Sequence, residues 1–229
     1  MLITCLQHSD FESPGCLVEW AQQRGHGLRL IRMHRGESIP DPAKLSDWLA
    51  VLGGPMGVYD ESRYPWLKDE KAYIRLSILG GRTVIGICLG AQLIAHVLGA
   101  HISRNRHPEL GWMPITTTLE ARGRFPLLPA SMYALCWHND TFDIPPQGIA
   151  FGSSEACQNQ GFFVGDRVLG LQFHLEWSPQ DIKRLVDNSA DEFSARGKYI
   201  QLPGDILAGV EWAQRANTLM VGLLDALPV

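Results

Sequence analysis

One short segment constrains the fold of this chain more than any other. It is Gly86-Ile87-Cys88-Leu89-Gly90, which follows an apolar run at residues 83–85 and precedes a helical pattern at 89–98. The two glycines remove Cβ atoms where a strand that turns sharply into a helix crowds the backbone. A cysteine on such a turn lies beside the N–H groups of the helix N-terminus, which favour the thiolate. The segment therefore predicts a nucleophile elbow with Cys88 as the nucleophile.

The first half of the chain alternates apolar runs with amphipathic stretches. This alternation implies parallel strands joined by right-handed crossovers, with ligands beyond the carboxyl ends of the strands. The predicted fold class is α/β, a three-layer αβα sandwich whose central sheet is mostly parallel and flavodoxin-like. Strands are expected at residues 2–6, 28–31, 48–52 and 83–87, and helices at 14–24, 64–79 and 89–98.

The second half has a different pattern, in which short strands follow one another closely. Such spacing favours antiparallel strands at one edge of the sheet. A helix is expected after Ser178-Pro179, because serine caps a helix and proline suits its first turn. We predict one domain over residues 1–229, with a core at about 2–180 and a helical extension at about 181–229. Within these bounds we expect strands at 113–118, 131–137, 149–153, 161–164 and 168–173, a short helix and a loop at 187–204, and a last helix at 205–227.

Composition excludes several classes of function. Hydrophobic residues make up 45% and charged residues 19% of the chain, and the formal net charge of −4 argues against a nucleic-acid partner. No apolar run is long enough to span a bilayer and no signal-peptide pattern is present, so we expect neither membrane contact nor export. The odd number and wide spacing of the cysteines argue against disulfides and a zinc site, so we expect a cytoplasmic protein with no metal and no cofactor. The cysteines are Cys5, Cys16, Cys88, Cys136 and Cys157.

A candidate base and its orienting carboxylate lie in Gln172-Phe173-His174-Leu175-Glu176, at the end of an apolar run. Alternate residues of a strand face the same side, so Glu176 can hold the imidazole of His174 in the tautomer that accepts a thiol proton. An exposed histidine followed by a helix-entry glutamate is the alternative. The rival base is His138, in a predicted polar turn at residues 137–140.

A glycine-rich loop, Gly53-Gly54-Pro55, follows the third predicted strand. Glycines allow backbone N–H groups to approach an anion. The loop has neither the spacing nor the lysine of a phosphate-binding loop. We therefore predict that the N–H groups of Gly54 and Leu89 form an oxyanion hole. An ordinary Gly-Pro turn is the alternative.

Taken together, these segments resemble the class I, triad-type glutamine amidotransferases. The resemblance runs from about residue 2 to about residue 179. Residues 52–64 and 137–142 are most similar to stand-alone proteins related to the amidotransferase domain of GMP synthase. The motifs occur in the order found in the family: Gly53-Gly54-Pro55, Gly86-Ile87-Cys88-Leu89-Gly90-Ala91-Gln92, and Gly170-Leu171-Gln172-Phe173-His174-Leu175-Glu176.

The resemblance implies a catalytic triad of Cys88, His174 and Glu176 that hydrolyses glutamine. Cys88 would attack the γ-carboxamide to form a γ-glutamyl thioester, and water would then release glutamate. Gln92 would contact the glutamine. A turn at His138, Asn139 and Asp140 would bind its α-amino and carboxylate groups through backbone atoms, although members of the family often have glycine at the position of Asn139.

The resemblance leaves three functions open. Residues 188–229 are too few for a synthetase module, so a separate synthetase subunit would receive the ammonia in the first function. In the second, the enzyme hydrolyses γ-glutamyl peptides or γ-glutamyl amines by the same mechanism. In the third, the chain is a non-catalytic or partner-activated regulatory subunit.

Overall fold

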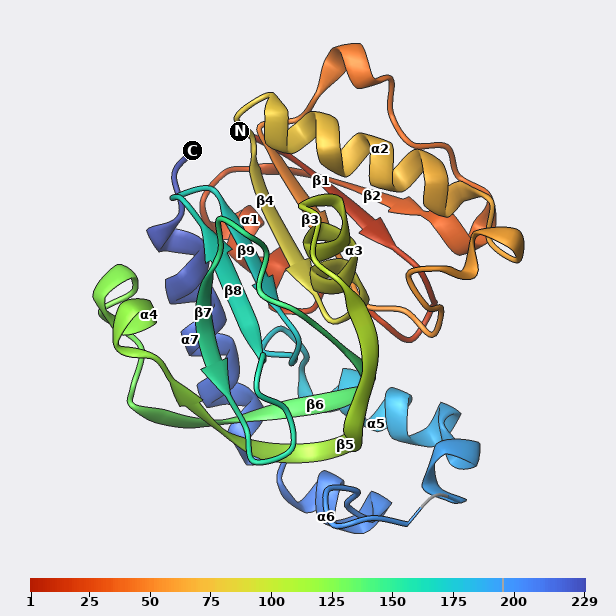
Figure 1. Cartoon of the computed structure of the whole chain (residues 1–229), viewed down its shortest axis with the longest axis vertical. Coiled ribbons are helices and arrows are strands. Elements are labelled where there is room, and N and C mark those ends of the chain that lie inside the picture. Colours follow the sequence, from red (N-terminus) through yellow and green to blue (C-terminus); the bar gives the residue numbers. More distant parts are fainter. Residues whose placement is uncertain (195) are drawn as a thin grey trace.

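A single mixed sheet organises the structure, which is a computed structural model describing residues 1–194 and 196–229 (Figure 1). Its strand order within the described residues is β2-β1-β3-β4-β9-β8-β7-β5-β6. The strands are β1 (Leu2–Gln7), β2 (Gly27–Arg32), β3 (Trp48–Val51), β4 (Thr83–Ile87), β5 (Ile102–Thr117), β6 (Ser131–Phe142), β7 (Ile149–Ser153), β8 (Gly161–Val164) and β9 (Val168–Leu171). The α-helices are α1 (Cys16–Gln23), α2 (Trp66–Leu79), α3 (Leu89–Val97), α4 (Leu119–Arg124), α5 (Pro179–Asn188), α6 (Pro203–Ala208) and α7 (Glu211–Ala226).

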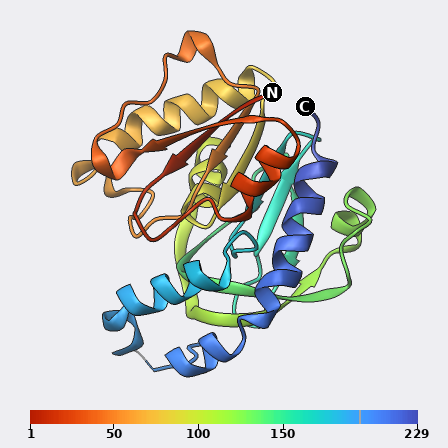
Figure 2. The ribbon, with the colours of Figure 1, turned by 180° about the vertical axis from the view of Figure 1, so that it is seen from behind.

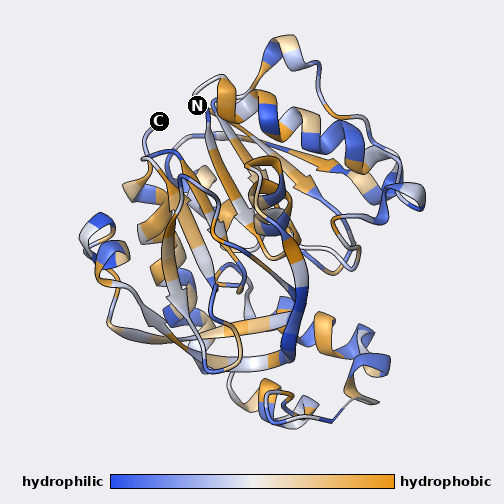
Figure 3. Ribbon diagram, viewed as in Figure 1, coloured by the Kyte–Doolittle hydropathy of each residue, from blue (hydrophilic) through white to orange (hydrophobic). Residues whose placement is uncertain are grey.

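The sheet has a parallel half and an antiparallel half. Strands β2, β1, β3, β4 and β9 pair in parallel. Strands β9, β8, β7, β5 and β6 pair antiparallel in that order. This confirms the predicted α/β class with an antiparallel edge. The central strands β4 and β9 are buried throughout and largely hydrophobic, as expected for strands covered on both faces (Figure 3).

Helices cover both faces of the sheet and complete the three layers. Seen from behind, α1 and α7 lie side by side across one face (Figure 2). Trp20 of α1 and Met220 of α7 belong to the core on this side. The opposite face is covered by α2 and α3, whose Ile74 and Leu93 belong to the second core. Because β1, β3 and β4 are parallel neighbours, their carboxyl ends meet at one edge of the sheet.

The region predicted as a polar turn at residues 137–140 is instead part of a strand. β6 runs on to Phe142 because β5 supplies an antiparallel partner, so that His138 pairs with Glu109 and Asp140 with Arg104. Between these two pairs, residues 105–108 of β5 stand opposite Asn139 alone. A long antiparallel partner extends a strand through polar residues, and for this reason the chain forms no turn at residues 137–140. The bulge still interrupts the regular ladder at Asn139, as bulges near active sites do.

The C-terminal part differs from the sequence prediction in one respect. The helix predicted at 205–227 is two helices, α6 and α7, which are separated at Gly209. A Cβ on Gly209 would lie 2.5 Å from the Trp112 ring, so the chain crosses that ring closely where it changes direction. Helix α5 begins as expected, with Ser178 capping Asp181 in a reciprocal capping box. The predicted short helix is a 3-10 helix, Ala190–Ser194, and residue 195 of that prediction lies outside the described residues.

None of the helices in the described ranges combines the length and apolar composition needed to cross a bilayer.

Candidate active site

The elbow around Cys88 has the strained backbone that the two glycines predict. Cys88 stands between β4 and α3 with φ 53° and ψ −110°, and it is the one non-glycine residue with positive φ among the described residues. A Cβ on Gly86 would lie 2.5 Å from the carbonyl group of Gly90, and one on Gly90 would lie 2.0 Å from the Val51 carbonyl oxygen. Neither position has room for a side chain. The sulfur is held at the N-terminus of α3 by the packing of its neighbours.

This packing predicts a large loss of stability in Gly90→Ala. The added methyl group would overlap backbone of β3, so we expect the free energy of unfolding to fall by about 3 kcal/mol. Urea denaturation followed by circular dichroism measures the change. Gly123→Ala in α4 is the matched control, because nothing lies within 4 Å of its added Cβ and alanine favours a helix. Equal stability of the two variants would contradict the close packing at the elbow.

His174 and Glu176 form a buried pair beyond the end of β9. The Nδ1 atom of His174 lies 2.7 Å from Oε1 of Glu176, and the Leu175 N–H donates to Oε2 at 3.0 Å. The Trp177 ring stacks on the imidazole with the centroids 3.6 Å apart, and the His174 N–H donates to the Leu135 carbonyl oxygen. Backbone, carboxylate and indole therefore fix the orientation of the imidazole.

Electrostatic coupling links this pair to Cys88. Burial alone would lower the pKa of His174, but the Glu176 carboxylate and the hydrogen bond with Cys88 raise it to about 10. Burial raises the pKa of the Cys88 thiol, while the hydrogen bond with His174 and its charge oppose that increase. Because Glu176 occupies Nδ1, it is Nε2 that remains for the thiol. The pKa of the Cys88 thiol stays above its usual value, and its hydrogen bond with His174 gives the thiol proton a path to the imidazole when the sulfur attacks.

The Gly53-Gly54 loop lies against the start of α3. A Cβ on Gly54 would be 2.7 Å from Cβ of His8 and 2.9 Å from Cδ2 of Leu89. His8 supports the loop from behind, since its Nδ1 lies 2.9 Å from the Gly53 carbonyl oxygen and its Nε2 lies 2.8 Å from Oε1 of Glu70. The two predicted oxyanion donors thus belong to neighbouring segments. The sequence gives no signal for the His8–Glu70 support, because only the fold brings those residues together.

A cavity of about 440 Å³ opens beside the elbow. It is lined by Cys88, by Gly54 and Leu89 of the predicted oxyanion hole, by Gln92 and by residues 137–140. His174 and Glu176 lie behind this lining. The Gln92 side chain donates to Oε1 of Gln172 at 3.1 Å, which holds it across the cavity wall. The structure therefore gathers the sequence-predicted residues around one cavity.

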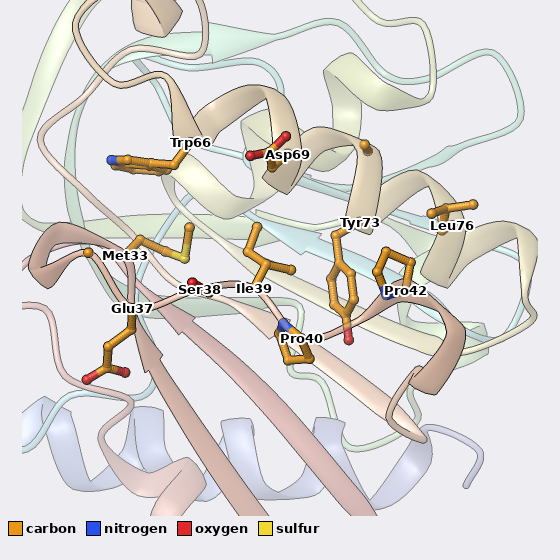
Figure 4. A pocket seen from close by; sticks show the side chains of 12 residues that line it. Met33, Glu37, Ser38, Ile39, Pro40, Pro42, Trp66, Asp69, Tyr73 and Leu76 are labelled. Atoms are coloured by element: carbon orange, nitrogen blue, oxygen red, sulfur yellow. The ribbon is translucent and has the colours of Figure 1, made fainter.

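Another cavity, of about 450 Å³, is lined by none of the predicted site residues. It lies between residues 33–42 and α2, where Trp66 and Tyr73 face Met33, Ile39 and Pro40 (Figure 4). Its walls supply no cysteine or histidine. We therefore assign the chemistry to the cavity beside Cys88.

His138 lines the same cavity as Cys88, but its imidazole belongs to a second buried cluster. Its Nδ1 lies 2.9 Å from the Asp140 carbonyl oxygen and its Nε2 lies 3.1 Å from Oε2 of Glu109. Ligand atoms of His138, Glu109 and Cys136 come within 4.8 Å of one another. Burial raises the pKa of Cys136 well above that of a free thiol, and the two oxygens of Glu109 already accept from Ser154 and Gln160. Because the Cys136 thiol is fully buried and stays protonated, this cluster offers no nucleophile to the cavity.

The fold and site define an α/β protein with a cysteine at a nucleophile elbow, and comparison with known proteins names its family. The model of the family described as glutamine amidotransferase class-I matches residues 16–192, so this chain belongs to that family. The glutamine amidotransferase-like protein YfeJ of Salmonella typhimurium is 35% identical over 99% of this chain and 97% of its own length. Gamma-glutamyl peptidase 3 of Arabidopsis thaliana is 30% identical over 72% of this chain and 69% of its own. The crystal structure of a glutamine amidotransferase from Thermotoga maritima has a TM-score of 0.88 at 30% identity, covering 98% of this chain and 96% of that one.

Proposed function

We propose that this protein is a glutamine amidotransferase-type hydrolase that cleaves the γ-amide bond of glutamine through a thioester on Cys88. One observation carries the proposal: a strained cysteine at a helix N-terminus lines a cavity and is coupled to a buried histidine–carboxylate pair. Nucleophile, base and orienting carboxylate are the parts that acyl transfer requires. Membership of the amidotransferase family supports the choice of substrate.

In the first half-reaction, the sulfur of Cys88 attacks the γ-carbonyl carbon while Nε2 of His174 takes the thiol proton. The carbonyl oxygen becomes an oxyanion, which the N–H groups of Gly54 and Leu89 stabilise. The intermediate collapses to the thioester as the C–N bond breaks, and His174 passes its proton to the leaving nitrogen. Glu176 stabilises the imidazolium throughout.

In the second half-reaction, water replaces the departed ammonia. His174 takes a proton from the water, whose oxygen attacks the thioester carbon, and the C–S bond breaks. Glutamate leaves and the thiolate recovers its proton from His174. The glutamyl part of the substrate is bound by Gln92 and by the backbone around His138, Asn139 and Asp140, where the bulge frees main-chain groups.

Hydrolysis of γ-glutamyl peptides or γ-glutamyl amines is the second candidate. The cavity has the volume of about fifteen liquid water molecules, which leaves space for a group on the amide nitrogen. Gamma-glutamyl peptidase 3 among the relatives also favours this candidate. Turnover of glutamine, glutathione and a γ-glutamyl amine separates the two, because a strong preference for glutamine would contradict the second.

Two further roles are compatible with family membership and remain proposals. A separate synthetase subunit would consume the ammonia, or a partner would activate the chain by ordering Gly53-Gly54. Glutaminase activity of the isolated protein that increases on addition of a synthetase would support both. An isolated protein that hydrolyses no γ-glutamyl compound but binds a synthetase would favour the regulatory subunit.

A glutamine-analogue chloroketone is expected to alkylate Cys88 alone. Cys88 lines the cavity, and its hydrogen bond with His174 opposes the effect of burial on its pKa, whereas burial raises the pKa values of Cys5 and Cys16 to about 12 and leaves them as thiols. Peptide mass mapping locates the adduct. Excess glutamine added first should slow the labelling, and an adduct shared among several cysteines would argue against a selective nucleophile.

A further inference from the structure

The carboxylate of Glu12 is the least explained group at the active-site cavity. Glu12 lies in the loop between β1 and α1, at the carboxyl end of a parallel strand, and only 8% of it is exposed. It lines the cavity beside Cys88, and its Oε2 atom is buried with no hydrogen-bond partner among the described residues. A buried polar atom without a partner is costly, so such atoms in native proteins generally have a function.

Glu12 lies immediately beside the proposed base. A Cβ on Gly53 would be 1.8 Å from Oε2 of Glu12 and 3.2 Å from Cε1 of His174, so the missing side chain makes room for both groups. The Gln7 side chain donates to the Glu12 carbonyl oxygen at 3.0 Å and fixes the loop. The carboxylate is therefore placed by its surroundings rather than left free on the surface.

The other charged groups lining this cavity already have partners. Asp60 accepts from the Gly57 N–H, Asp140 lies 3.5 Å from the Arg104 guanidinium, and Glu192 accepts from the Trp137 indole. Four carboxylates thus face the cavity against one guanidinium, among the residues the structure describes. This charge balance favours a cation, and the unpartnered carboxylate is where it would be held most strongly.

We propose that Glu12 binds a primary ammonium group of the substrate. This inference rests on the proposed function and refines its substrate class. The ammonium has two sources: the α-amino group of the glutamyl part, or a second amine carried by the leaving group of a γ-glutamyl diamine. The closeness of Glu12 to His174 favours the leaving group, because the same imidazole protonates the leaving nitrogen and the glutamyl part is assigned to Gln92 and residues 138–140.

Two amides of matched shape test the assignment. N-γ-glutamyl-1,4-diaminobutane carries a terminal ammonium, and N-γ-glutamyl-pentylamine carries a methyl group in its place. We expect wild type to favour the cationic amide in kcat/KM by about 10- to 100-fold, the range of a hydrogen bond to a charged group, and Glu12→Gln to lose that preference. Glu12→Asp should keep part of it, and Glu155→Gln, which changes an exposed carboxylate that does not line the cavity, should keep all of it.

A second pair of substrates locates the ammonium. If Glu12 binds the α-amino group, Glu12→Gln will lower turnover of glutamine but not that of 4-carbamoylbutanoate, which lacks this group. An unchanged preference in both pairs would overturn the proposal. Binding of the two γ-glutamyl amides to Cys88→Ala, measured by calorimetry, repeats the comparison without turnover. Cys88-independent or absent hydrolysis would refute the proposed function, whereas equal binding of the two amides would refute only a contact of Glu12 with the leaving group.

The preference should also depend on pH. Burial raises the pKa of Glu12 to about 7, with His174 and His8 lowering it and Glu176 and Glu192 raising it. Only the deprotonated carboxylate binds a cation, so the preference should appear as the pH rises through about 7 and disappear below it. The ratio of the two kcat/KM values cancels the titration of Cys88 and His174, which both substrates share. A constant ratio between about pH 6 and about pH 8 would contradict the assignment.

Discussion

Cys88→Ala is expected to abolish γ-glutamyl amide hydrolysis, with a loss in kcat/KM of at least about 10⁴-fold. Without the sulfur no thioester forms, and water in its place lacks the nucleophilicity and position of the thiolate. The fold should survive, because the Cys88 sulfur makes only weak polar contacts: one at 3.8 Å from the Trp137 carbonyl oxygen and the hydrogen bond with His174. Release of glutamate and of ammonia or amine measures the activity, and thermal unfolding monitored by circular dichroism measures the fold.

Cys16→Ala is the control for this variant. Cys16 is half-buried in α1, and burial keeps its thiol protonated, so its removal should leave kcat/KM within a few-fold of wild type. A Cys88→Ala protein that retains a tenth of the activity would exclude the thioester mechanism. If wild type and Cys88→Ala are equally inactive on every γ-glutamyl compound, the result would instead favour the proposal that the chain is a regulatory subunit.

The elbow could be predicted because its geometry is a local property. Gly86, Cys88 and Gly90 are near neighbours in the chain, and the need for two missing side chains is visible in their spacing. The His174–Glu176 pair is local in the same sense, since the two residues are two positions apart, although β9 ends at Leu171 rather than at residue 173 and the pair lies beyond the strand. Signals of this kind need no knowledge of the tertiary structure.

Pairing between strands that are distant in the chain explains why the environment of His138 was not predicted. The polar residues after Trp137 have the composition of a turn, but β5 continues the ladder and places His138 opposite Glu109. The two residues are far apart in the chain, so no local pattern reveals that His138 faces into the core. The same pairing places the His138 nitrogens beside the Asp140 carbonyl oxygen and the Glu109 carboxylate, which favours His174 as the base.

Glu12 illustrates a second limit. The alternation of strands and helices indicates that loops at the carboxyl ends of parallel strands meet, which places the β1–α1 loop near the site only in general terms. Its position near His174 depends on the absence of a side chain at Gly53, because an added Cβ would overlap the Glu12 carboxylate. A glutamate after a strand is common, and its sequence context gives no sign of burial.

Glu176→Gln should reduce kcat/KM by about 10³- to 10⁴-fold, close to the effect of the corresponding neutral substitution in a Ser-His-Asp triad. One carboxylate oxygen of Glu176 faces Nδ1 of His174 and the other accepts from the Leu175 N–H. An amide has a single oxygen, so its NH₂ group must point at one of these two positions. Facing Nδ1, it imposes the wrong tautomer, and facing Leu175, it places two donors against each other.

The charge lost with Glu176 also changes the pH dependence of stability. The raised pKa of His174, about 10 against about 6.5 when unfolded, stabilises the folded protein fully below pH 6.5, and this contribution is lost as pH rises toward 10. The difference in unfolding free energy between wild type and Glu176→Gln should therefore be largest in mild acid and decrease at alkaline pH. A purely steric defect would give a difference independent of pH.

Glu109→Gln distinguishes between the two Cys-His-Glu clusters. It makes the same chemical change in the buried group of Cys136, His138 and Glu109, whose thiol is sealed from the cavity. We expect this variant to lose stability, because Glu109 accepts short hydrogen bonds from Ser154 and Gln160, yet to keep kcat per folded molecule within about tenfold of wild type. If Glu109→Gln removed activity while Glu176→Gln retained it, His138 rather than His174 would be the base, and the proposed triad would be wrong.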